Sequence, residues 1–114
     1  MTNFYDNYES CDNFRFLKFP HSLFSNEQYV SMTNDAKLLY ALMRDRTSLS
    51  LKNRWFDDLG NLYIYYTIKE IERTLHCSHN KAIRMLAELE TVHLIQRVKQ
   101  GQGKPTKFYV RKIL

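Results

Sequence analysis

The sequence has few cysteines, few glycines and no long apolar run. Its two cysteines, Cys11 and Cys77, lie far apart without CxxC spacing, so neither a zinc knuckle nor a disulfide framework is predicted. The longest apolar runs, such as LLYALM, are far too short to cross a bilayer. The first residues, MTNFYDNYESCDN, lack the basic start and apolar run of a signal peptide. We therefore expect a cytoplasmic protein with no membrane partner.

The chain does contain enough apolar material for one core. Its 114 residues are 44% hydrophobic and 14% aromatic, with 25% charged residues. This balance offsets the conformational entropy lost on folding and excludes an intrinsically disordered chain. The length suits a single compact domain, because domains usually run to about 100–150 residues.

The net charge of +5 is distributed unevenly along the chain. Before Arg15 the sequence has Asp6, Glu9 and Asp12 but no lysine or arginine. From Thr91 onward no acidic residue accompanies six basic ones: Arg97, Lys99, Lys104, Lys107, Arg111 and Lys112. Such a cluster attracts polyanions, of which nucleic acid is the commonest and an anionic membrane the next. Charge alone does not show whether this segment binds a polyanion or is only a basic chain end exposed to solvent.

The first half of the chain is predicted to contain an arm, a helix and a hairpin. In residues 14–19 aromatic and basic residues interleave, which suggests a short strand or an extended arm that ends at the following proline. Thr33 is a favourable N-cap, and apolar residues at three-and-four spacing predict a helix over about residues 34–49. Turn-forming residues between two aromatic stretches predict a hairpin over residues 53–67, with its firmer strand at 62–66.

We divide the chain into an amino-terminal arm, residues 1–30, and a winged-helix domain, residues 31–114. The arm carries more apolar surface than an isolated arm needs, in Phe14, Phe16, Phe19, Phe24 and Tyr29. Because exposed apolar patches usually mark contacts, we expect self-association through the arm, giving a homodimer. The alternative is that the arm packs on the core of its own chain.

Residues 67–90 carry the pattern of two helices joined by a tight turn. Thr67 and Glu70 form a capping box at the start of the first helix, and Ser78 can cap the second after a turn of about three residues. The apolar positions of the second helix define its buried face: Ala82, Met85, Leu86 and Leu89. The polar positions then face outward: Asn80, Lys81, Arg84 and Glu88. This pattern predicts a helix-turn-helix.

The segment after this unit predicts a β-hairpin with a basic tip. Residues 94–99 and 107–114 favour strands, and QGQGKPT lies between them. Gly101 and Gly103 permit the positive φ angles that a flexible tip needs, and lysines flank it. The element order is then that of a winged helix-turn-helix: an α+β, mainly α fold with a three-helix core, a small antiparallel sheet and a β-hairpin wing. The wing would lie beside the helix that enters a major groove.

The residue pattern does not indicate catalysis or metal binding. His76, Cys77 and His79 are too crowded on one turn for tetrahedral coordination, so we expect no metal, and Cys77 is interpreted as a small apolar side chain that fills the turn. By helical angle His79 lies close to the buried side, but its place in the first turn keeps it a candidate contact. Asp57 and Asp58 fit turn chemistry, because no nucleophile, phosphate-binding loop or metal spacing accompanies them. We expect no enzyme and no cofactor.

Four stretches of the chain resemble the amino-terminal domain of RepA-type plasmid replication initiators. They are MTNDAKLLYALMRDRTSLSLKN, YIYYTIKEI, CSHNKAIRMLAELE and LIQRVKQGQGKPTKFYV, and the similarity runs from about Phe14 to the last residue. The resemblance implies sequence-specific binding of double-stranded DNA at origin repeats (iterons), commonly as a dimer, which initiates plasmid replication and controls copy number. Family members continue into a carboxyl-terminal domain that engages host replication proteins. Because this chain stops at Leu114, we expect it to be the DNA-binding fragment of a longer protein.

The resemblance places the expected DNA contacts on two elements. The second helix of the helix-turn-helix, the recognition helix, would contribute Ser78, His79, Asn80, Lys81 and Arg84. The wing would contribute Lys99, Gln102, Lys104 and Lys107. Two other functions remain open: a winged-helix transcriptional regulator, which the same residues would serve, and a protein-docking winged helix without DNA binding.

Overall fold

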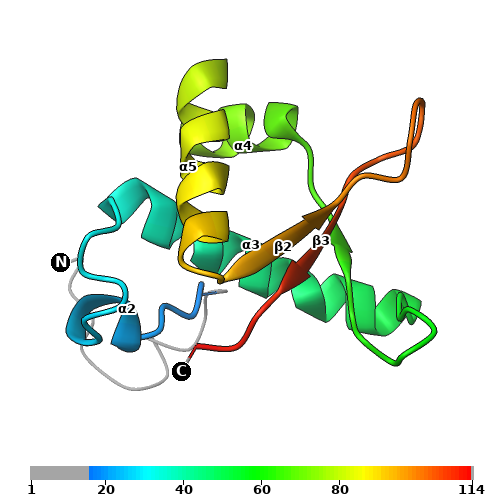
Figure 1. Ribbon diagram of the computed structural model, residues 1–114, viewed down its shortest axis with the longest axis horizontal. Coiled ribbons are helices and arrows are strands. Elements are labelled where there is room, and N and C mark those ends of the chain that lie inside the picture. The colour runs from blue at the N-terminus through cyan, green and yellow to red at the C-terminus, as the bar shows by residue number, and fades with distance from the viewer. Residues whose placement is uncertain (1–15, 114) are drawn as a thin grey trace, which may run out of the picture.

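The computed structural model describes residues 16–113. In this part of the chain the helices are α2 (Ser22–Ser25), α3 (Asn34–Asn53), α4 (Ile68–Leu75) and α5 (His79–Thr91). The strands are β1 (Ile64–Tyr65), β2 (Ile95–Val98) and β3 (Lys107–Val110). After α2 the order is helix, strand, helix, turn, helix, strand, loop and strand, which confirms the predicted winged-helix arrangement (Figure 1).

The long helix α3 begins where the sequence predicts and ends later. The Thr33 side chain accepts a hydrogen bond from the Ala36 amide at 3.2 Å, so the predicted N-cap is confirmed. The helix continues to Asn53 rather than residue 49, because SLSLKN contains no glycine or proline to stop it. It ends where Arg54 adopts a left-handed conformation with φ 57° and donates its amide to carbonyl oxygens of the last turn.

Local capping sets the geometry of α4 and α5. The Thr67 hydroxyl accepts the Glu70 amide at 3.0 Å, and the Glu70 carboxylate accepts the Thr67 amide at 3.2 Å, so the predicted capping box is present. His76 ends α4 with φ 50°, and Ser78 caps α5 by accepting the Lys81 amide at 3.1 Å. Cys77 lies between them, half-buried against the core, as expected for a small apolar residue in the turn.

The sheet pairs segments that are distant in sequence. Its order is β1-β3-β2, with antiparallel pairing that sets Ile64 opposite Phe108 and Ile95 opposite Val110. The hairpin predicted for residues 53–67 is reduced to one bridge between Phe56 and Leu62. The strand of that hairpin is therefore shorter than predicted, and its partner is β3 rather than the preceding segment.

The core lies where α3, α4, α5 and one face of the sheet meet. Leu39, Ile64, Leu89 and Phe108 are buried in this cluster. Truncating one of the large side chains, for example Leu89→Ala, is expected to cost about 2–5 kcal/mol, because the lost transfer energy and the cavity add.

Part of the proposed arm belongs to the same core. Leu23 and Tyr29 are buried in the cluster, and Phe19 packs against it while its ring stacks on Phe24 at 5.2 Å between centroids. Residues 16–20 form neither a helix nor a strand. Phe14 lies outside the described residues. The arm thus contributes packing to its own chain, while the exposed Phe16, Phe24 and Val30 leave an apolar surface.

Candidate nucleic-acid interface

The exposed face of α5 presents a mixed polar and apolar stripe. Asn80 and Arg84 are exposed, as predicted, and four-residue spacing places them one above the other. Ile83 and Ala87 are exposed beside them. The opposite face is buried as predicted, through Ala82, Met85, Leu86 and Leu89. A helix with this distribution can offer its outer face to a partner without disturbing the core.

The first turn of α5 is ordered by contacts to its own chain. Ser78 uses its hydroxyl as the N-cap, so its side chain is already engaged with the Lys81 amide. The side chain of His79 is 58% exposed rather than packed, and its Nδ1 lies 3.4 Å from the Glu72 carboxylate of α4. His79 is therefore accessible as a contact, with the Glu72 carboxylate as its neighbour.

Lys81 and Glu88 do not simply face solvent, which corrects the outward placement predicted from helical angle. The Lys81 ammonium lies 2.6 Å from the Asp35 carboxylate in the first turn of α3. The Glu88 carboxylate accepts hydrogen bonds from the amide and the hydroxyl of Thr33, at 2.9 and 2.8 Å. These contacts attach one edge of α5 to the start of α3, beside an open groove of about 500 Å³ that Arg84 also lines.

The β2–β3 loop, residues 99–106, forms the wing and projects away from the helices (Figure 1). Gly101 and Gly103 have φ angles of 107° and 78°, so the predicted need for positive φ is confirmed. At the base of the loop the Gln100 side chain donates to the Pro105 carbonyl at 2.8 Å. Gln102 and Lys104 are exposed at the tip. The wing therefore presents an exposed lysine at its tip. Replacing Gly101 or Gly103 by a residue with a side chain would strain the backbone of the tip.

The two lysines that flank the tip differ in their surroundings. Lys99 is exposed, and its side chain lies at the end of β2 where the wing begins. Lys107 is half-buried, and its ammonium lies 4.3 Å from the centroid of the Tyr63 ring. A cation over an aromatic face gains about 0.5–1 kcal/mol at exposed sites, so Lys107 would have to leave this ring to meet a phosphate directly.

The basic cluster predicted from the end of the chain is divided in the fold. Arg97 forms an ion pair with Glu90 at 2.7 Å, and its guanidinium lies over the Phe108 ring. Arg111 donates to the Gln96 side chain at 2.9 Å. Within this cluster Lys99 and Lys104 are exposed on the wing, and Lys112 is exposed after β3.

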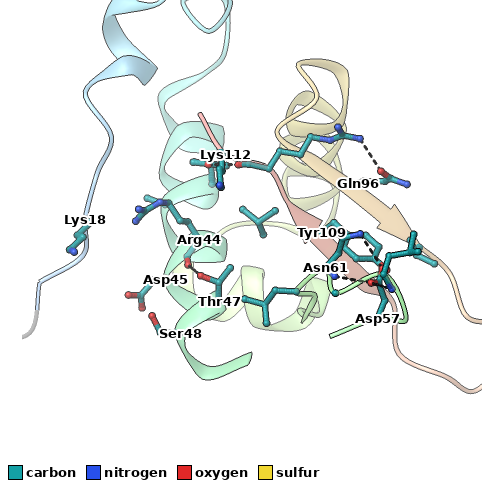
Figure 2. A pocket seen from close by; sticks show the side chains of 18 of the residues that line it. Lys18, Arg44, Asp45, Thr47, Ser48, Asp57, Asn61, Gln96, Tyr109 and Lys112 are labelled. Carbon is teal, nitrogen blue, oxygen red and sulfur yellow. Dashed lines mark hydrogen bonds between the residues drawn. The ribbon is translucent and has the colours of Figure 1, made fainter. Parts of the chain in front are cut away.

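A separate cleft of about 1140 Å³ opens beside the carboxyl-terminal strand (Figure 2). Its lining comes from the segment before α2, from α3, from residues 57–62 and from β2 and β3. Asp57 contributes to it but accepts hydrogen bonds from the Leu59 and Asn61 amides, at 2.9 and 2.8 Å, and from the Tyr109 hydroxyl at 2.8 Å. The Asn61 and Tyr109 bonds hold the pKa of Asp57 below its ordinary value. The turn role predicted for Asp57 is confirmed.

Two further observations concern residues 16–113. Within this range no three or more His, Cys, Asp or Glu side chains are grouped so that they could hold a metal ion. The helices of the same range include none with the length and apolar content needed to span a membrane.

Ile83 is a candidate interface residue that the sequence pattern did not single out. The signal was present, since it lies three residues after Asn80 and outside the predicted buried face. An isoleucine in an amphipathic helix is ordinarily assigned to the core, and only its 40% exposure in the fold places it on the outer stripe.

The three-helix core, the α4-turn-α5 unit and the projecting hairpin define a winged helix-turn-helix domain. The chain belongs to the family described as the N-terminus of replication initiator protein A (RepA), whose model matches residues 15–114. The resemblance noted in the sequence is therefore confirmed.

Relatives agree with this assignment. A protein of Lactobacillus helveticus described as a 41 kDa protein is 42% identical over 86 residues, which cover 75% of this chain and 24% of the relative. This chain thus matches about a quarter of that relative's length. A solved structure described as the N-terminal domain of a DNA binding protein is 34% identical, with TM-score 0.81, and the match covers 99% of this chain and 86% of that chain. A structure described as a Rep-DNA complex is also 34% identical, with TM-score 0.81 and coverage of 96% and 85%.

Proposed function

We propose that this chain binds double-stranded DNA in a sequence-specific way at the repeats of a plasmid origin, as the DNA-binding part of a replication initiator. The observation that carries the proposal is the stripe on α5, where Asn80 and Arg84 are exposed one turn apart and the opposite face is buried. Asparagine and arginine are the side chains that make paired hydrogen bonds to adenine and guanine edges. The similarity to the protein in the Rep-DNA complex supports the same partner.

The two elements are assigned different roles. Asn80 and Arg84 read base edges in the major groove, with a discrimination of about 1–3 kcal/mol for each good bidentate contact. Ser78, His79 and Lys81 lie at the start of α5, where a helix N-terminus with a hydroxyl, an imidazole and an ammonium group suits phosphate contacts. Lys99, Gln102, Lys104 and Lys107 belong to the wing or its base and hold the adjacent backbone or minor groove.

Assembly and partners extend the proposal. A homodimer through the arm, residues 1–30, is supported by the exposed Phe16, Phe24 and Val30, which are 57–58% exposed. Host replication proteins would engage a part of the initiator outside this chain, in keeping with the length of the 41 kDa relative. Such an initiator acts in the cytoplasm and controls plasmid copy number by binding its own origin.

The proposal is tested by selecting duplexes from a randomised pool with the purified chain and footprinting the chain on the replicon that encodes it. We expect one preferred sequence, present in the replicon as tandem direct repeats, and an affinity that falls with salt. Arg84→Ala should bring the affinities for selected and scrambled duplexes closer together. A single palindrome at a promoter would favour the transcriptional regulator instead. Recovery of no sequence, with no salt-dependent binding of any duplex, would refute DNA binding.

A further inference from the structure

Ile83 is an exposed isoleucine in the middle of α5 that packing does not explain. It is 40% exposed, and among the exposed large hydrophobic residues of the described chain it is the one that lies in α4 or α5. Helix propensity does not explain it either, because β-branched side chains lose rotamer freedom in a helix and lysine or glutamine would be more favourable. Single exposed apolar residues are common on proteins, so the neighbours of Ile83 decide its interpretation.

Those neighbours form the outer stripe of α5. Asn80 and Ala87 lie three residues before and four residues after Ile83 and are exposed, so they adjoin it on the helix surface. Ala87 is small and does not hold a partner surface away from Ile83. Lys81, which is bound to Asp35 of α3, lies about 160° around the helix from Ile83 at 3.6 residues per turn. The isoleucine thus lies on the edge that α3 leaves uncovered.

We propose that Ile83 packs against the C5 methyl group of a thymine in the major groove, so that α5 selects thymine at one position of its site. This inference rests on the proposed function, because it requires α5 to enter the major groove. Each base pair shows a distinct pattern there, and the thymine methyl is the apolar feature that a side chain without hydrogen-bonding groups can recognise. Asn80 and Arg84 supply the polar part of the reading surface, and Ile83 supplies the apolar part.

Helix geometry adds an expectation for the site. Asn80 and Ile83 are three residues apart, which is about 4.5 Å along the helix axis, and base pairs are stacked about 3.4 Å apart. Their contacts therefore fall about one or two base pairs from each other. Since asparagine pairs with adenine, the preferred sequence should hold an adenine and a thymine at that spacing.

The test replaces single thymines by uracil, which removes only the methyl group. The probe is the duplex selected from the randomised pool, with each thymine replaced in turn. At one position we expect wild-type binding to weaken about fourfold, the affinity equivalent of about 0.8 kcal/mol for burying one methylene-sized group. Ile83→Ala should bind the thymine and uracil forms equally. Leu59→Ala is the matched control, because Leu59 is the most exposed large hydrophobic residue among residues 16–113 and lies in the loop between α3 and β1, and it should keep the fourfold difference.

The outcomes separate this inference from the proposed function. If the selected duplex binds with salt-dependent affinity but no uracil replacement weakens wild-type binding, the inference is overturned and the proposed function stands. If the uracil effect persists in Ile83→Ala, another group reads the methyl and the inference is also overturned. The uracil series on wild-type protein needs no variant, so it decides the question even if a variant folds poorly. Failure to select any duplex refutes the proposed function itself and the inference with it.

Discussion

The ion pair between Lys81 and Asp35 allows a quantitative test of how a carboxylate of the domain competes with DNA phosphate for a lysine of α5. The Lys81 ammonium lies 2.6 Å from the Asp35 carboxylate, and the side chains are 43% and 53% exposed. An exposed pair of this kind contributes at most about 1 kcal/mol, so a DNA phosphate can compete with Asp35 for the ammonium. We expect Asp35→Asn to release Lys81 for phosphate contact.

The magnitude follows from one additional neutralised phosphate. The slope of log affinity against log salt should become steeper by about 0.9. Removing up to about 1 kcal/mol of competition should tighten binding by up to about fivefold at low salt, on selected and scrambled duplexes alike. Asp35 also lies in the first turn of α3, where its charge favours the helix by about 0.3–1 kcal/mol, so the thermal midpoint should fall slightly.

The assay is a titration of four proteins at several salt concentrations: wild type, Asp35→Asn, Lys81→Ala and the double variant. If Asp35 acts through Lys81, the gain in affinity and slope disappears when Lys81 is absent, so the effects are not additive. Asp58→Asn is the matched control, since it makes the same charge change on an exposed residue of the loop after Phe56. An equal gain from Asp35→Asn in the Lys81→Ala background would refute the reasoning, because the effect would then be general loss of negative charge.

Three further predictions follow from the interface and the fold. Lys104→Ala should weaken all duplexes about equally and make the salt slope shallower by about 0.9, whereas an unchanged slope in filter-binding titrations would mean that the wing does not grip phosphate. Partial burial raises the pKa of Glu70, but the hydrogen bond and charge of Arg46 and the bonds from Thr67 outweigh it and lower the pKa below its ordinary value. Glu70 therefore stabilises the fold fully above its unfolded pKa of about 4.3, and this stabilisation is lost as pH falls through the folded value. The difference in thermal midpoint between wild type and Glu70→Gln should accordingly shrink below about pH 5, and parallel melting curves at all pH values would contradict this. Phe16→Ser removes an exposed ring without touching the buried arm residues, so it should shift sedimentation toward the monomer, and unchanged sedimentation would argue against the arm as the dimer contact.

The sequence by itself determined the helix-turn-helix and the wing, because their signals are local. A cap needs only a side chain and an amide three residues away, so Thr33, Thr67 and Ser78 identified the starts of α3, α4 and α5 directly. The buried face of α5 followed from its periodicity. The glycines of the wing marked positive φ angles, because that backbone region strains other residues.

Only the tertiary structure decided which distant groups meet. β1 pairs with β3, more than forty residues later in the chain, because the folded core brings them together while the nearby segment forms only one bridge. Likewise Asp35 reaches Lys81 only because α3 crosses α5 at that point. Helical angle shows that a side chain leaves the buried face of its own helix, but not whether another element covers it. For that reason the sequence pattern predicted that Lys81 faces solvent and did not single out Ile83. In the fold Lys81 pairs with Asp35, and Ile83 is exposed.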